Sequence, residues 1–135
     1  MRELNPRAWS IDSECWCTRV DYDGYKEEWS GIVPVLAPDN RSKRIGEVED
    51  TNIIVEFPTG IKDKNGQKIY EGDIVLDYYD GDDAFIVDWD KDTASFVLTD
   101  TCDVSNVSFD NFYPDKDLEV IGNIHENQEL LEDKV

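Results

Sequence analysis

Histidine and basic side chains are scarce in this sequence of 135 residues. It has one histidine, and 13 lysines and arginines stand against 32 aspartates and glutamates, which gives a net charge of −19. The single histidine and the absence of a nucleophile signature around any serine argue against a Ser-His-Asp type of catalytic triad. The excess of acids repels phosphate backbones, so we expect no direct binding of nucleic acid.

Long apolar runs and paired cysteines are missing as well. No run of 18 apolar residues is present, so we expect no membrane-spanning segment. Residues 1–6 have neither an apolar core nor a small-residue cleavage site, which is not the pattern of a signal peptide. The three cysteines are an odd number, which argues against a secreted disulfide framework. These features favour a cytoplasmic protein.

The sequence also lacks the spacing of known metal sites. Cys15 and Cys17 are separated by one residue, whereas zinc sites use C-x₂-C pairs or added histidines, and the other candidates are Cys102 and His125. Aspartates are dense between residues 80 and 92, but their spacing is not that of an EF-hand loop. We therefore expect structural cysteines, solvated turns, no metal and no cofactor. The aspartates concerned are Asp80, Asp82, Asp83, Asp88, Asp90 and Asp92.

The acidic charge is unevenly distributed. Residues 1–45 hold seven bases and eight acids, a net charge of −1, and residues 46–135 hold six bases and 24 acids, a net charge of −18. A net charge of about 2 to 8 in magnitude is enough to keep a small domain in solution. The excess is either a solvated surface or a surface that docks on basic proteins, and the sequence leaves both interpretations open.

Apolar residues mostly recur with a period of two, which predicts strands. Asn65-Gly66 suits a tight hairpin turn, and Gly122 suggests a bulge or a close approach of the backbone. A short helix is expected at residues 126–132, with Asn127 as its cap. The stretch 37–44 is polar and reads as an exposed loop. The predicted strands are residues 7–10, 15–20, 53–57, 73–79, 84–89, 95–99, 104–109 and 118–124.

The predicted fold class is all-β. We expect a small twisted sheet or SH3-like barrel over residues 53–124, with added N-terminal strands and a short C-terminal helix. The predicted organisation is one domain, in which the strands and loop of residues 1–50 pack on a core within residues 51–135. The expected core residues are Trp9, Val55, Phe57, Ile69, Tyr70, Ile74, Leu76, Phe85, Val87, Trp89, Phe96, Leu98, Val120, Ile121 and Ile124.

Three segments together resemble one protein family. They are residues 2–9 (RELNPRAW), residues 59–75 (TGIKDKNGQKIYEGDIV) and residues 119–131 (EVIGNIHENQELL). They are similar to the YopX family, whose members are encoded by bacteriophages and prophages. Gln128 stands where the family usually has proline, and glutamine also tolerates a helix. The resemblance implies a phage gene product in a bacterial host cell and supplies no catalytic residues.

The sequence favours a non-enzymatic binding or assembly protein. Small β folds commonly bind through aromatic grooves and loops. The expected partner is a protein, either a host protein or a second copy of the chain, so that a homo-oligomer is one outcome. The candidate partner-binding residues are Tyr78, Tyr79 and Tyr113 as exposed anchors, with Leu130 and Leu131 docking on a neighbouring subunit or on their own sheet.

Two alternative functions remain open. In the first, the chain is an acidic decoy that occupies a host DNA-binding protein, because rows of carboxylates can imitate rows of phosphates. This would require elongated acidic stripes, whereas many acids here fall in expected hairpin tips. In the second, the chain is a metal-dependent hydrolase whose surface carboxylates hold the ion. Its candidate ligands are Asp73, Asp77, Asp88 and Asp90.

Overall fold

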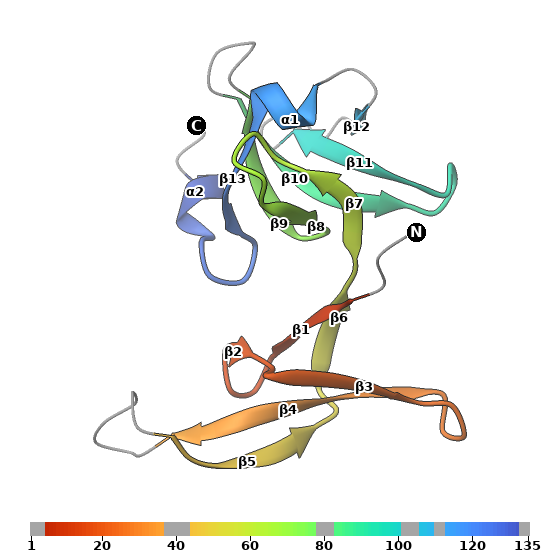
Figure 1. The fold of residues 1–135 in the computed structure, drawn as a ribbon, viewed down its shortest axis with the longest axis vertical. Helices are drawn as coiled ribbons and strands as arrows, with labels where there is room; N and C mark the ends of the chain where they lie inside the picture. The colour runs from red at the N-terminus through yellow and green to blue at the C-terminus, as the bar shows by residue number, and fades with distance from the viewer. Residues whose placement is uncertain (1–4, 37–43, 78–82, 101–105, 110–112, 133–135) are drawn as a thin grey trace. The chain divides into compact units, whose positions relative to one another are not determined.

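The computed structural model describes residues 5–36, 44–77, 83–100, 106–109 and 113–132. Antiparallel strands dominate these residues, as the all-β prediction requires (Figure 1). The chain divides into two compact units, an N-terminal unit, Asn5–Glu56, and a C-terminal unit that begins at Phe57. Each unit has its own sheets, so the two are described separately below.

The N-terminal unit contains two three-stranded sheets. In the first, β1 is central and lies between β2 and β6; in the second, β4 is central and lies between β3 and β5. The strands predicted at residues 7–10 and 15–20 are confirmed in part, since the second divides between β2 and β3. β4 and β5 were not predicted. The bounds are β1 Arg7–Ser10, β2 Cys15–Trp16, β3 Arg19–Asp23, β4 Glu28–Leu36, β5 Arg44–Asp50 and β6 Ile53–Glu56.

The C-terminal unit is built on a five-stranded sheet with the order β12-β11-β10-β9-β13. Its centre is the predicted three-stranded meander. The order has two ends, so the sheet is open, and no closed barrel forms among the described residues. Of the two forms predicted, a sheet is therefore observed and a barrel is not. The bounds are β9 Asp73–Asp77, β10 Asp83–Asp90, β11 Ser95–Asp100, β12 Asn106–Ser108 and β13 Leu118–Asn123.

A smaller hairpin and two short helices complete the C-terminal unit. β7 (Pro58–Lys62) pairs with β8 (Lys68–Tyr70) across the predicted Asn-Gly turn, where Gly66 has a φ of 81°. The strand predicted at residues 53–57 ends at Glu56, and Pro58 begins the next strand. The strand before it, β6, pairs with β1 in the N-terminal unit and is not part of the C-terminal sheet. The helices are α1 (Pro114–Asp117) and α2 (Glu129–Glu132).

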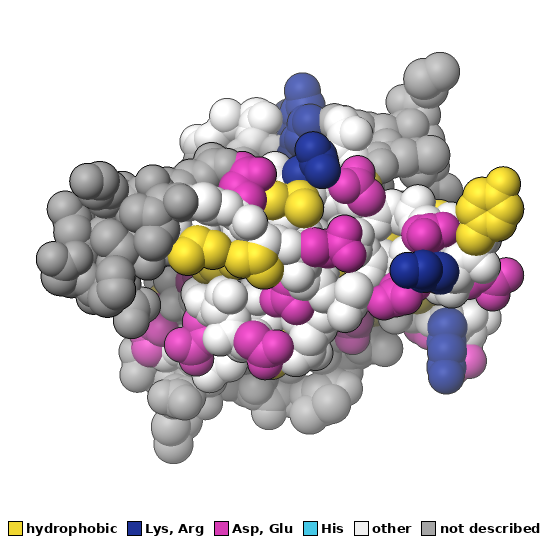
Figure 2. Space-filling model, turned by 90° about the horizontal axis from the view of Figure 1, so that it is seen from below, with side chains coloured by type: hydrophobic (Ala, Val, Ile, Leu, Met, Phe, Trp, Pro, Cys, Tyr) yellow, Lys and Arg dark blue, Asp and Glu magenta, His cyan; other side chains and the backbone are white. Residues whose placement is uncertain are grey.

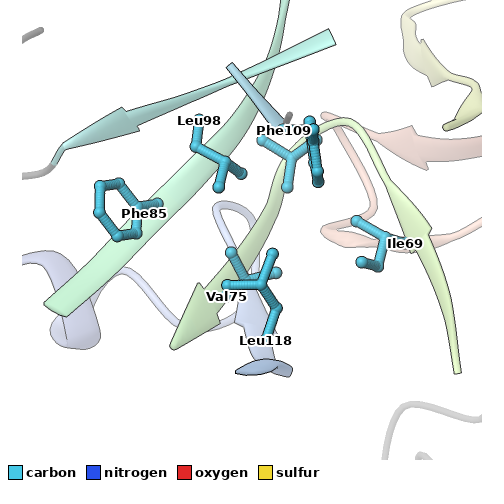
Figure 3. Packing of buried hydrophobic residues seen from close by; sticks show 7 residues of the cluster. Ile69, Val75, Phe85, Leu98, Phe109 and Leu118 are labelled. Carbon is cyan, nitrogen blue, oxygen red and sulfur yellow. The ribbon is translucent and has the colours of Figure 1, made fainter. Parts of the chain in front are cut away.

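The core of the C-terminal unit is a cluster of apolar side chains from several strands (Figure 3). The predicted core residues Ile69, Ile74, Phe85, Val87 and Leu98 are buried, and Phe96 and Val120 pack against the cluster. Most of the other predicted core residues are half-buried. Prediction missed several members of the buried set. These are Val75, Phe109 and Leu118.

The prediction that Trp89 belongs to the core is wrong. It continues the alternation of Phe85 and Val87 but is 42% exposed. It lies next to the end of β10, where it packs edge-to-face on Phe96 with the ring centroids 4.9 Å apart. Alternation places it on the correct face, but the buried cluster does not extend that far along the strand.

The bulge expected at Gly122 is confirmed. The pairing of β13 with β9 shifts register between Val120 and Gly122. A Cβ at Gly122 would lie 2.6 Å from Asn127 Oδ1, so the side chain of Asn127 occupies the space beside this glycine. The Asn127 oxygen accepts the N–H of Asn123 at 3.1 Å. Its side chain therefore holds the end of β13, a role different from the expected helix cap.

Candidate interaction surface

One face of the sheet β2-β1-β6 carries large apolar side chains. The register pairs Trp9 with Trp16 on one side and with Ile54 on the other. Residues directly opposite each other in an antiparallel pair point to the same face. The two indole rings meet edge-to-face with centroids 5.2 Å apart, and Ile54 is 40% exposed. Ile11, just beyond the end of β1, is 47% exposed. We call Trp9, Ile11, Trp16 and Ile54 the aromatic stripe.

An ion pair stands beside the aromatic stripe. Arg7 Nε lies 3.0 Å from Glu56 Oε1, and the guanidinium carbon lies 4.5 Å from the centroid of the Trp16 ring. Glu56 is 4% exposed, so its charge is paired in a poorly hydrated position. The pairing holds the Arg7 guanidinium over the Trp16 ring, which restricts the motion of both side chains.

The opposite face of the same sheet is covered. Ala8 and Ser10 are both 0% exposed. The Ser10 hydroxyl donates to Asp50 on β5, which ties β1 to the second sheet. Because one face is buried and the other carries exposed apolar groups, the aromatic stripe is the outward face of this sheet.

Cys15, which is paired with the buried Ser10, and Cys17 lie on the covered side of the first sheet. Both are free thiols and half-buried. A Cβ at Gly31 would lie 2.3 Å from Cys17 Sγ, so this sulfur occupies the space that a side chain on β4 would need. Burial, and then the Asp50 carboxylate, raises the pKa of both thiols above the ordinary 9.0. Such thiols are poor nucleophiles. Cys102 lies outside the described residues.

The turn between β3 and β4 is ordered and fully exposed. Asp23 Oδ1 accepts the backbone N–H groups of Tyr25 at 2.9 Å and Lys26 at 3.3 Å. Glu27 has a φ of 50°, the left-handed conformation that reverses the chain. The side chain of Tyr25 is 102% exposed. The turn therefore presents a tyrosine on a backbone held by its own hydrogen bonds.

Two further aromatic residues support this turn. Tyr22 and Trp29 are directly paired across β3 and β4, with ring centroids 5.0 Å apart. Tyr22 is itself 51% exposed. We call residues 21–29 the hairpin tip; it belongs to the long antiparallel ribbon of β3 and β4 in Figure 1.

The other face of the sheet β3-β4-β5 is acidic. Alternation from Tyr22 and Trp29 places the neighbouring acids of these strands on the face opposite the aromatic pair. Arg19 is on this face too, paired with Asp21 at 3.1 Å. Figure 2, seen from below, shows many Asp and Glu side chains with few Lys and Arg among them. The exposed acids of this face are Asp21, Asp23, Glu28, Glu47 and Glu49.

The central segment of the YopX resemblance, residues 59–75, stabilises the C-terminal unit. Asp63 is 2% exposed, and its Oδ1 accepts the N–H groups of Asn65 and Gln67, each at 2.9 Å. Its Oδ2 accepts the N–H of Val120 at 2.9 Å. The next residue, Lys64, donates its backbone N–H to Leu118 O. One carboxylate therefore closes the β7–β8 turn and fastens it along β13, a strand at the edge of the sheet.

Glu71 and Asp73 act in the same way. Glu71 Oε1 accepts the N–H of Phe57 at 2.9 Å, and Asp73 Oδ2 accepts the N–H of Tyr70 at 2.8 Å. Gly72 between them has a φ of 85° and donates its N–H to Val87 O. The acids of the motif thus bind backbone groups of their own unit, which gives this motif a structural role.

The partner-binding residues expected from sequence are only partly within the described structure. Tyr78 and Tyr79 lie outside the described residues, as does the side chain of Leu131. Tyr113 is 68% exposed beside α1, with Lys116 Nζ 5.8 Å from its ring centroid. Leu130 is half-buried. Prediction overlooked the aromatic stripe and the hairpin tip, although three of the four tryptophans fall between residues 9 and 29.

The acids considered for metal binding do not converge. Asp73 and Asp77 are buried at 2% and 3% exposure, whereas Asp88 is exposed on β10. Within the part of the chain that the structure describes, no group of three or more His, Cys, Asp or Glu side chains could hold a metal ion. His125 donates its backbone N–H to Asn123 Oδ1 at 3.0 Å. Asp80 and Asp82 lie outside the described residues.

Among the described residues, none of the helices has the length and apolar character needed to cross a membrane.

Comparison with known proteins identifies the family. The model of the YopX protein family matches residues 6–132. The chain belongs to the YopX family. A crystal structure of protein EF1440 from Enterococcus faecalis is similar, with a TM-score of 0.61 and 26% sequence identity over 97% of this chain and 99% of that chain. No curated protein matches the chain. The family match and the structural similarity each extend over nearly the full length of the chain.

Proposed function

We propose that this YopX protein is a non-enzymatic protein-binding module, and that it binds its partner through the aromatic stripe. The observation that carries the proposal is the outward face of β2-β1-β6, where Trp9 and Trp16 pack together beside exposed Ile11 and Ile54. Tryptophan and arginine are the residues most enriched among interface hot spots. Grouped apolar side chains on an outward sheet face are typical of interaction sites.

The rigidity of the stripe supports the same function. Arg7 is held between Glu56 and the Trp16 ring, so little conformational freedom remains to be lost when a partner binds. The partner is another protein or a second copy of the chain. The family resemblance is what supports an origin in a phage or prophage and a place in the host cytoplasm.

Site-specific photo-crosslinking in bacterial cells tests the proposal. A photoreactive phenylalanine analogue replaces Ile54 in one variant and Lys91, in an exposed turn of the other unit, in the matched control. We expect a discrete crosslinked protein from position 54 and none from position 91. The mass of the product, and its identification by mass spectrometry, separate a host protein from a second copy.

A substitution in the stripe completes the test. Trp16→Ala removes a large contact and should weaken binding by about 2 kcal/mol or more, which would abolish the crosslink from position 54. Amide hydrogen exchange of the N-terminal unit checks that the variant keeps its fold, and Trp89→Ala, in the C-terminal unit, is the control. Equal crosslinking from positions 54 and 91, or a crosslink that survives Trp16→Ala, would refute the proposal.

A further inference from the structure

The hairpin tip combines an exposed tyrosine with a turn that is already held by hydrogen bonds. A flexible loop in place of the hairpin tip would have to lose conformational entropy when it binds a partner. Here the Asp23 carboxylate already fixes the turn by accepting the N–H groups of Tyr25 and Lys26. The Tyr22–Trp29 pair stiffens the ribbon just behind it. Tyr25 nevertheless covers no apolar surface of its own unit, since it is 102% exposed.

The charge around Tyr25 indicates what the tip can contact. Residues 21–28 (DYDGYKEE) contain four acids and one lysine, a net charge of −3, and all eight are exposed. A second copy of the chain carries a net charge of −19 and presents the same acidic tip. Like charges brought together at an interface oppose association. Nucleic acid is opposed by the same repulsion.

We propose that the hairpin tip inserts Tyr25 into a positively charged site on a partner protein, where the partner's arginine or lysine side chains pair with the flanking carboxylates. This inference rests on the proposed function, because it names the chemistry of the partner. An arginine of such a site stacks on the tyrosine ring by a cation–π contact while its neighbours meet Glu27 and Glu28. A single nucleic-acid strand also presents aromatic bases between anionic phosphates, and proteins bind it in positively charged grooves. A groove of this kind on the partner protein therefore fits the hairpin tip.

The proposal is tested on the full chain with a short synthetic peptide of alternating arginine and leucine as the probe, and with its glutamate-leucine counterpart as the negative control. Binding is measured by isothermal titration at low salt and again at physiological salt. We expect the arginine peptide to bind, the glutamate peptide not to bind, and the affinity to fall as salt rises, because exposed charge pairs are screened.

Matched variants localise the contact. Glu27→Gln with Glu28→Gln removes two charges from the tip and spares Asp23, which holds the turn. Asp88→Asn with Asp92→Asn removes two exposed charges from β10 and the turn after it in the other unit. We expect the tip variant to bind the arginine peptide about three- to ten-fold more weakly and the control to change by less than about two-fold. Tyr25→Ala should weaken binding about three-fold through loss of the cation–π contact.

Several outcomes would overturn the inference. Equal losses in the two double variants would show that the peptide senses only the overall charge. Unchanged binding in Tyr25→Ala would exclude the aromatic contact. Self-association by light scattering that disappears in Tyr25→Ala, or binding of a single-stranded oligonucleotide in place of the peptide, would assign the tip another occupant. If any of these results is obtained and the crosslink from position 54 is still observed, the inference about the hairpin tip fails but the proposed binding through the aromatic stripe is still supported.

Discussion

Replacing Asp63 with alanine removes the carboxylate that joins the β7–β8 turn to β13. Three backbone N–H groups, those of Asn65, Gln67 and Val120, then lose an acceptor that each holds at 2.9 Å. A hydrogen bond contributes ~0.5–1.5 kcal/mol, which applies to the exposed Asn65 and Gln67, whereas leaving the half-buried Val120 N–H without a partner costs ~1–3 kcal/mol. The three together predict a loss of about 2–6 kcal/mol. A domain has ~5–15 kcal/mol of stability in total. The C-terminal unit of Asp63→Ala should therefore be only marginally folded.

Asp63→Asn is the graded version of the same change. Asparagine keeps one acceptor oxygen but turns an NH₂ group toward a backbone donor. We therefore expect an intermediate loss of about 2–3 kcal/mol. The matched control is Asp92→Ala, whose carboxylate lies in an exposed turn and whose loss should cost less than ~0.5 kcal/mol.

Urea unfolding followed by circular dichroism measures the stability, and amide hydrogen exchange locates it. Exchange is needed because a chain of two compact units need not unfold in one step. The amides of Asn65, Gln67 and Val120 should lose protection first, before those of the N-terminal unit. If Asp63→Ala costs less than about 1 kcal/mol and the Val120 amide stays protected, the bonds to this carboxylate do not stabilise the unit as argued.

Three further changes test other contacts. Gly31→Ala places a Cβ 2.3 Å from Cys17 Sγ and should destabilise the N-terminal unit by about 1–3 kcal/mol in urea unfolding, with partial rescue by Cys17→Ala. Gly66→Ala meets open space but forces alanine to a φ of 81°, so its cost should be only about 1–2 kcal/mol and should show no rescue by a neighbour. The raised pKa of Cys15 and of Cys17 means that ionisation of these thiols favours the unfolded chain. Stability should then fall as pH rises from ~7 to ~9.5, more in the wild type than in the double serine variant, and iodoacetamide should alkylate the folded thiols more slowly than the unfolded ones.

The predicted elements that proved correct are those with strong local signals. The meander of β9, β10 and β11 follows from alternation between short polar turns, and the Asn65-Gly66 turn follows from the need for positive φ. The bulge at Gly122 was likewise visible as a glycine inside an alternating strand. β4 and β5 escaped notice because Pro34 and Gly31 interrupt one strand and acids fill the other.

The candidate surface was harder to foresee, because it depends on which strands pair. Sequence indicated that Trp9 belongs to a strand, but only the pairing of β1 with β2 and β6 brings Trp16 and Ile54 beside it. Exposed Tyr113 was found from its residue type alone. The exposure of Tyr25 follows from the β3–β4 turn, which required knowledge of β4.

The sequence by itself determined the family, the β class, the excess of negative charge and the local turns, since each of these depends on residue type and on near neighbours. The tertiary structure decided which side chains are buried and what each carboxylate binds. Asp63 shows the reason: its Oδ1 partners lie two and four residues away, but its Oδ2 partner, Val120, lies 57 residues away. A solvated turn and a buried clamp have the same residues in sequence, and only the strand that packs beside the turn distinguishes them.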